Sequence, residues 1–155
     1  MINRVLIRIR VIQILYSTYL NKSGDLNKAE NELIFSFQKS YDLYYLLLSL
    51  LIEITDTYIR RVETRKAKLL PTQEDINPNT KLIDNLFIKQ LRDNEYFNKY
   101  MSDRPQSWEN HETFIKSLLD TILKSDVYQE YSENPNADYD TDREFWRKIF
   151  KTYIY

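Results

Sequence analysis

Three arginines near the start of the chain, Arg4, Arg8 and Arg10, are the side chains whose type and spacing best suit a specific chemistry. A guanidinium group pairs with phosphate oxygens and stacks on unpaired bases. No acidic residue lies within residues 1–24 to neutralise these charges. Cations at the N-terminus of a helix also oppose its dipole, so helix stability alone does not explain them. The pattern indicates a basic site that faces an anion such as nucleic acid.

The same arginines have a second interpretation that involves no ligand. Long basic side chains can keep a mostly apolar helix in water by holding their charged ends at its surface. When the segment is projected as a helix at about 100° per residue, Arg4 and Arg8 lie on one flank and Arg10 near the opposite side. The residues by themselves leave both interpretations open, and they separate Arg10 from the other two.

A second basic group is explained by helix structure. It comprises Arg60, Arg61, Arg65, Lys66 and Lys68, with Glu63 as the only acid among them. These residues lie near the predicted C-terminus of a long helix, where cations complement the dipole and bond to the last carbonyl groups. We therefore expect them to stabilise a helix end.

The rest of the composition argues against an active site. The chain has no cysteine, one histidine (His111) and one glycine, which excludes disulfides, paired-histidine zinc motifs and glycine-rich phosphate loops. The neighbouring acids Glu109 and Glu112 are explained as an exposed acidic helix start. The 22 lysines and arginines balance 23 acids, so an electrostatic partner must be attracted locally. We expect no enzyme activity, metal or cofactor.

The elements that position these residues are predicted to be helices. A single glycine in 155 residues leaves few tight turns or bulges, which favours an all-α fold. The first helix is predicted at residues 3–20, with an apolar face at Ile2, Val5, Ile9, Ile12, Tyr16 and Tyr19. A second helix from residue 26 and a third at 41–68 follow; the sequence leaves open whether the two are continuous, and it offers residues 36–40 as the place of a kink.

Residues 69–81 carry two prolines and are predicted to be a linker. Short helices are expected at 81–92, 94–101 and 107–126, the last with Phe114, Leu118, Thr121 and Ile122 facing inward. A capping box formed by Thr141 and Glu144 is predicted to open the last helix. The sequence thus predicts a bundle of about five to seven helices, divided into residues 1–70 and an additional helical segment at 71–155.

No signal peptide or membrane span is predicted. The most apolar run, residues 43–54, is too short to cross a bilayer and ends beside Glu53. We expect a cytoplasmic protein.

The segment RVLIRIRVIQILYS, residues 4–17, resembles the opening of the NusB family of transcription antitermination factors. That family begins with an arginine-rich segment that leads into a helix with a Gln-x-Leu-Tyr signature, here Gln13, Leu15 and Tyr16. The run DLYYLLLSLLIEI is similar to the leucine-rich third helix of the family. The long variant of Bacteroidetes-type bacteria, in which extra helices separate two halves, is the form it most resembles. That likeness implies a further C-terminal half.

The resemblance implies a bacterial RNA-binding protein that assembles with the transcription elongation complex on ribosomal RNA operons. It implies boxA RNA and the ribosomal protein NusE as partners, and it makes Arg4, Arg8 and Arg10 the RNA-binding candidates. Gln13, Leu15 and Tyr16 would orient and pack the helix.

Two alternatives remain. The first is a helical protein-interaction module without an RNA role, for which Trp108, Trp146 and residues 153–155 are candidate contacts, since aromatic residues favour interfaces. For Trp146, core packing is the expected role. The second is the NusB-like domain that precedes some RNA methyltransferases. A homodimer is also left open.

Overall fold

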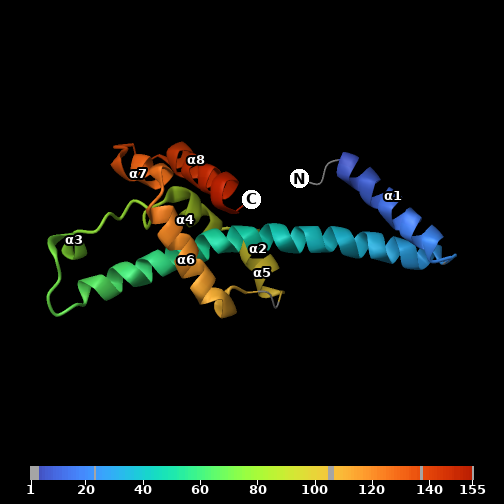
Figure 1. Ribbon diagram of the computed structural model, residues 1–155, viewed down its shortest axis with the longest axis horizontal. Helices are drawn as coiled ribbons and strands as arrows, with labels where there is room; N and C mark the ends of the chain where they lie inside the picture. The colour runs from blue at the N-terminus through green and yellow to red at the C-terminus, as the bar shows by residue number, and fades with distance from the viewer. Residues whose placement is uncertain (1–3, 23, 105–106, 137, 155) are drawn as a thin grey trace. The chain divides into compact units, whose positions relative to one another are not determined.

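The chain is all-α. A computed structural model describes residues 4–22, 24–104, 107–136 and 138–154, so Ile2 and Tyr155 lie outside the described residues. Within those ranges the structure has eight α-helices, a short 3₁₀-helix and a terminal π-helix, and no strand (Figure 1). The predicted fold class is confirmed, with one α-helix more than the upper end of the expected number.

The contacts divide the chain into two compact units, unit 1 (Met1–Tyr44) and unit 2 (Tyr45–Tyr155). Helix α2 (Leu26–Lys66) contributes its first part to unit 1 and its second part to unit 2. The domain boundary predicted near residue 70 stays a prediction. The two units that the contacts define meet between Tyr44 and Tyr45.

Unit 1 consists of α1 (Arg4–Leu20) and the first part of α2. Helix α1 is followed by Lys22, whose φ of 50° is the left-handed conformation common after a helix C-terminus. The carboxylate of Asp25 accepts a hydrogen bond of 3.1 Å from the Lys28 N–H and so caps the start of α2. Among the described residues of unit 1 only Ile14, Ala29 and Asp42 are buried, so most of its apolar side chains are exposed.

Helix α2 runs without interruption through residues 36–40, where the sequence left open a kink between two helices. The Ser36 hydroxyl donates to the Leu33 carbonyl at 2.9 Å, and the Ser40 hydroxyl donates to the Ser36 carbonyl at 3.1 Å. Each serine therefore satisfies its polar group within the helix, and no glycine or proline is present to stop it. The two helices whose continuity the sequence left open are therefore one helix.

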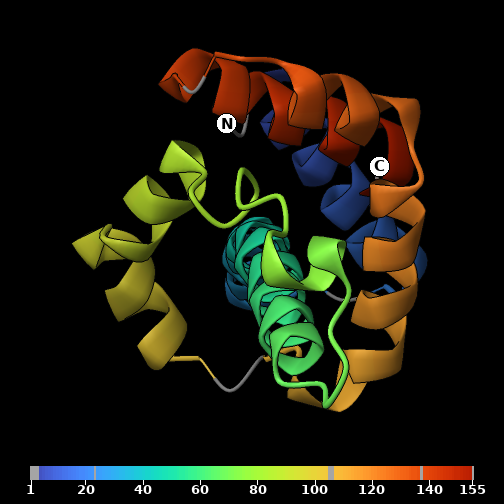
Figure 2. The ribbon, with the colours of Figure 1, turned by 90° about the vertical axis from the view of Figure 1, so that its left-hand side faces the viewer.

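Unit 2 gathers its helices around the second part of α2. They are α3 (Gln73–Ile76), α4 (Leu86–Arg92), α5 (Glu95–Ser102), the 3₁₀-helix η1 (Glu109–His111), α6 (Glu112–Leu123), α7 (Asp126–Glu133), α8 (Tyr139–Ile149) and the π-helix η2 (Phe150–Ile154). Viewed along α2, α4 and α5 lie on one side, α6 on the other, and α7 and α8 across a third (Figure 2). The apolar core joins Leu50, Ile54, Leu119, Trp146 and Ile149, each at most 1% exposed.

The capping box of this chain lies at a different helix from the one predicted. Helix α8 begins at Tyr139, and its cap is Asp138, whose carboxylate accepts from the Thr141 N–H at 2.7 Å. The capping box predicted at Thr141 and Glu144 is therefore wrong, because Thr141 already lies inside the helix. A capping box does occur at Thr72 and Asp75, where it opens α3 within the predicted linker.

Helix α6 faces the core with a different set of residues from the one predicted. Ile115, Leu119 and Ile122 are buried, whereas Phe114 is 51% exposed and Thr121 is exposed. Of the four residues predicted to face inward, Ile122 is buried in the core and Leu118 is partly buried against it. The half-buried Trp108 precedes α6 and donates its indole N–H to the Leu46 carbonyl at 3.0 Å, which attaches this segment to α2.

Candidate nucleic-acid interface

Arg4 and Arg8 are exposed on α1, one helical turn apart. Neither side chain forms a hydrogen bond or ion pair with another described residue, and α1 carries no acidic residue that could pair with them. Two guanidinium groups on one face of the helix thus keep all their donors for an external partner. Helix α1 holds them because residues 4–20 contain no glycine or proline.

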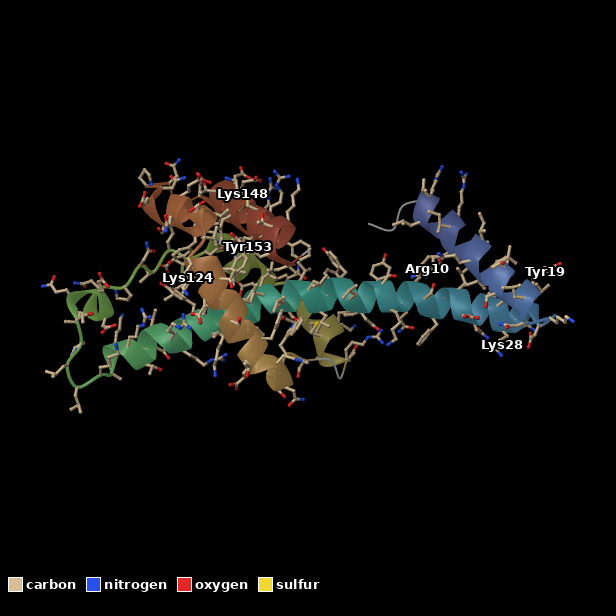
Figure 3. All side chains as sticks on the ribbon, viewed as in Figure 1. Arg10, Tyr19, Lys28, Lys124, Lys148 and Tyr153 are labelled. Atoms are coloured by element: carbon tan, nitrogen blue, oxygen red, sulfur yellow. The ribbon has the colours of Figure 1, made fainter. Side chains whose placement is uncertain are left out.

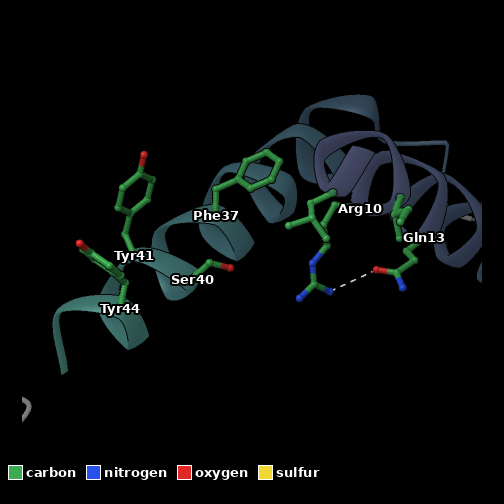
Figure 4. Close-up of a pocket in the computed structure, with 8 residues that line it drawn as sticks. Arg10, Gln13, Phe37, Ser40, Tyr41 and Tyr44 are labelled. Carbon is green, nitrogen blue, oxygen red and sulfur yellow. Dashed lines mark hydrogen bonds between the residues drawn. The ribbon is translucent and has the colours of Figure 1, made fainter. Parts of the chain in front are cut away.

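Arg10 lies apart from the other two arginines and makes a local contact. Its Nη1 donates a hydrogen bond of 3.2 Å to the Oε1 of Gln13, one turn along the same helix (Figure 4). Gln13 is neutral, so the charge of Arg10 stays uncompensated by this bond. The structure therefore brings Arg4 and Arg8 together and places Arg10 in a different setting, as the helical projection predicted.

Arg10 and Gln13 line a groove of about 590 Å³ between α1 and the first part of α2. Helix α1 contributes Leu6, Ile9, Arg10 and Gln13, and helix α2 contributes Phe37, Ser40, Tyr41 and Tyr44. Both sets follow the spacing i, i+3, i+4, i+7, which is one face of an α-helix. The groove therefore lies between two facing helical stripes, and both belong to unit 1.

The chemistry of this groove is apolar and aromatic with one positive charge. Arg10 is the only charged side chain among the described residues that line it, and no carboxylate does so. Gln13, Ser40 and the two tyrosine hydroxyls add hydrogen-bonding groups to walls made by Leu6, Ile9 and three aromatic rings. Aromatic rings beside a guanidinium group are the combination that binds unpaired bases and their phosphates.

Sequence reasoning missed the α2 side of this groove. Phe37, Tyr41 and Tyr44 recur at helical spacing, but because the continuity of the helix at residues 36–40 was left open, they could not be assigned to one face. Gln13 was assigned to packing, whereas it lines the groove beside Arg10. The sequence does carry a matching i, i+3, i+4, i+7 pattern in the two segments, but that pattern does not show that the two faces meet.

The two other residues of the Gln-x-Leu-Tyr signature, Leu15 and Tyr16, are 52% and 63% exposed. The exposed surface of α1 continues to Tyr19, which is 79% exposed near the end of the helix (Figure 3). Within the described structure these residues do not pack α1 into a core. Helix α1 thus presents both bare arginines and a wide apolar surface.

The second basic group is largely paired within unit 2. Arg61 binds Asp120 at 2.6 Å, Lys68 binds Asp75 at 3.0 Å, and Arg60 donates to the Thr57 hydroxyl at 3.0 Å. A groove of about 680 Å³ beside these residues also contains Glu53, Glu109 and Glu112. Burial, and then the neighbouring Asp56 carboxylate, raise the pKa of Glu53. Mixed charges of this kind suit a phosphate chain less well than the acid-free surface of α1.

Two further observations concern metal-binding groups and membrane spans in the part of the chain that the structure covers. No three histidine, aspartate or glutamate side chains gather there as a metal ion would require. None of the helices described combines the length and apolar character needed to cross a bilayer. Comparison with models of protein families, with curated proteins and with solved structures gives no match to the chain.

Proposed function

We propose that this protein is an RNA-binding transcription antitermination factor of the NusB type, which binds boxA-like RNA together with NusE on ribosomal RNA operons. The observation that carries the proposal is the pair of exposed arginines, Arg4 and Arg8, on a helix without acids and without partners for their guanidinium groups. A single-stranded RNA offers both a phosphate chain for these groups and unpaired bases for the neighbouring aromatic side chains.

The decisive measurement is the affinity of the full chain for a labelled boxA-like single-stranded RNA, measured by fluorescence anisotropy at several salt concentrations. The double variant Arg4→Glu with Arg8→Glu should bind more than tenfold more weakly, because two phosphate contacts become repulsive. Binding of the unaltered protein should weaken steeply with salt, because phosphate neutralisation releases counterions.

A matched control reverses the same amount of charge in unit 2. Lys124 lies at the end of α6 and Lys148 on α8, and both are exposed (Figure 3). The variant Lys124→Glu with Lys148→Glu has the same net charge as the test variant and should retain its affinity within about twofold. If both double variants lost RNA affinity equally, the loss would follow from net charge alone. That result would count against placing the RNA site on α1.

The NusE partnership is tested by thermodynamic coupling. If RNA and NusE bind the same assembled state, adding NusE must raise RNA affinity by the factor by which RNA raises NusE affinity. Equal factors show that both titrations have reached equilibrium, and no change in either affinity would count against cooperative assembly with NusE.

The second candidate function is a helical protein-interaction module without an RNA role. It is favoured by the exposed apolar side chains of α1, among them Ile12, Tyr16 and Tyr19, since exposed apolar patches mark interaction surfaces. Capture of NusE by the chain without any RNA binding at low salt would select this function.

A further inference from the structure

We propose that the groove between α1 and α2 in unit 1 holds one unpaired nucleobase of the bound RNA, with Arg10 contacting the adjacent phosphate. The inference rests on the proposed RNA binding and deepens it, because it assigns the stacking of a base to Tyr41 and Tyr44 of α2. Figure 4 shows Tyr41, Tyr44, Phe37 and Ser40 along α2, and Arg10 with Gln13 on α1.

The size and the walls of the groove suit a planar aromatic ligand. Its volume of about 590 Å³ lies within the range of small-molecule sites, which is about 300–1,000 Å³. Phe37, Tyr41 and Tyr44 supply aromatic faces or edges from α2, and Leu6 and Ile9 supply an apolar wall from α1. Stacking on aromatic rings accepts any base, because every base has a π face.

The polar groups of the groove suit the rest of a nucleotide. The guanidinium of Arg10 keeps donors beyond its single bond to Gln13, and a phosphate oxygen can accept them. The amide of Gln13 and the hydroxyl of Ser40 can each donate and accept a hydrogen bond, which matches the mixed donors and acceptors on the edge of a base. These two residues are therefore placed to read the base, while Arg10 holds the chain.

Charge distinguishes this occupant from an apolar helix of another protein. An uncharged helix laid in the groove would bury the guanidinium of Arg10 without an anion, which is costly. A nucleotide brings its own negative charge to that group. No carboxylate lines the groove among the described residues, so nothing there repels a phosphate.

The test uses the full chain and a set of boxA-like RNAs, namely the intact single strand, strands with one abasic site at each position in turn, and the duplex. The variant is Tyr41→Leu with Tyr44→Leu, which removes both rings and keeps good helix formers. The matched control, Tyr16→Leu with Tyr19→Leu, removes two exposed rings of α1 that do not line the groove.

We expect the groove variant to bind the intact single strand about tenfold more weakly, with an unchanged dependence on salt. At one position in the RNA, an abasic site should lower the affinity of the unaltered protein by a similar factor. The groove variant should bind that abasic RNA no more weakly than the unaltered protein does. The control variant should retain its affinity, and the duplex should bind the unaltered protein at least about tenfold more weakly, since its bases are not free to enter the groove.

The outcomes separate this inference from the proposed function. If Arg4→Glu with Arg8→Glu abolishes binding while the groove variant binds normally, the base site is wrong and RNA binding stands. If the unaltered protein binds no RNA, both fail. If the groove variant binds RNA normally but no longer captures NusE, the groove is a protein-docking site and the inference is overturned.

A second measurement covers the case in which the groove variant does not fold, which circular dichroism would reveal. The unaltered chain is irradiated with RNA that carries 4-thiouridine at the position found by the abasic scan. Crosslinks should map to residues 37–44 by mass spectrometry. Crosslinks confined to unit 2 would overturn the inference.

Discussion

The hydroxyl of Tyr131 on α7 donates a hydrogen bond of 2.6 Å to the Oδ1 of Asp142 on α8, and both side chains are buried. The other carboxylate oxygen of Asp142 accepts the N–H of Leu86 at 2.6 Å, at the first residue of α4. Asn85, the cap of α4, donates to the Tyr131 hydroxyl at 3.0 Å. One buried carboxylate therefore joins three helices of unit 2.

Replacing Asp142 by alanine should lower the free energy of unfolding by about 2 kcal/mol, because the Leu86 N–H loses its acceptor and the Tyr131 hydroxyl keeps only the longer bond of 3.2 Å to the Lys81 carbonyl. The exposed Asp140 provides the control, since it lies in the same first turn of α8 and shares the interaction with the helix dipole. The variant Asp140→Ala should cost less than about 0.5 kcal/mol. Urea titrations of both variants measure the difference, and similar midpoints would show that the buried network contributes little.

Alkaline pH should destabilise unit 2 through two tyrosines. Burial, and then the hydrogen bond to Asp142, raise the pKa of Tyr131, while burial and the neighbouring Tyr58 hydroxyl raise the pKa of Tyr128. The unfolded chain loses these protons near pH 10, before the folded chain does. The stabilisation is therefore complete below about pH 10 and falls as the pH rises further.

This dependence is measured as the free energy of unfolding between about pH 9 and pH 11. Lysines also titrate in this range, so the informative quantity is the difference between the unaltered protein and Tyr128→Phe. The phenylalanine variant cannot ionise at that position and should lose stability less steeply. Parallel pH profiles for the two proteins would contradict the assigned role of Tyr128.

Asp75 should give a dependence of the opposite sign at acid pH. The hydrogen bond from Lys68, and then that from the Thr72 backbone, lower the pKa of this carboxyl. Its stabilisation is therefore present above the unfolded pKa of about 3.9 and is lost as the pH falls through the folded value. The stability difference between the protein and Asp75→Asn should be measurable at about pH 6 and vanish toward about pH 2. If the stability difference persisted in acid, it would have a cause other than the ionisation of Asp75.

The salt dependence of RNA binding should identify which arginines contact phosphate. For a single strand, each phosphate contact contributes about 0.7 to the slope of log K against log salt concentration. Arg8→Gln should reduce the slope by about that amount, and Arg10→Gln should do the same if its phosphate contact is as proposed. Arg61→Gln, which breaks an existing ion pair with Asp120 in unit 2, should leave the slope unchanged.

The sequence predicted the helical class and the bounds of α1 well, because these depend on local propensity and spacing. It failed in α6, where Phe114 with Ile115 and Leu118 with Leu119 are adjacent apolar pairs. Either member of each pair fits a helical stripe that ends at Ile122, so the pattern cannot choose the buried one. Tertiary contact makes the choice, as in the stacking of Phe114 on Trp108 with ring centroids 6.1 Å apart.

The residues of the candidate site also divide into those that the sequence identified and those that it did not. Arg4 and Arg8 could be identified from the sequence because bare cations at a helix start are unfavourable for the helix itself. The groove could not, because Arg10 and Tyr41 are 31 positions apart, and a helix–helix approach has no local signature. The continuity of α2 through Ser36 and Ser40 was the missing step, since it places Phe37 and Tyr44 on one face.

Both tryptophans of the chain lie in unit 2, and their surroundings differ. Trp146 is 1% exposed and its indole N–H has no hydrogen-bond partner among the described residues, whereas the half-buried Trp108 donates to Leu46 and Ser49. A dry, unbonded indole emits at shorter wavelength than a hydrogen-bonded one near water. Unit 2 therefore carries two spectrally distinct intrinsic fluorophores, while unit 1 must be followed through its tyrosines.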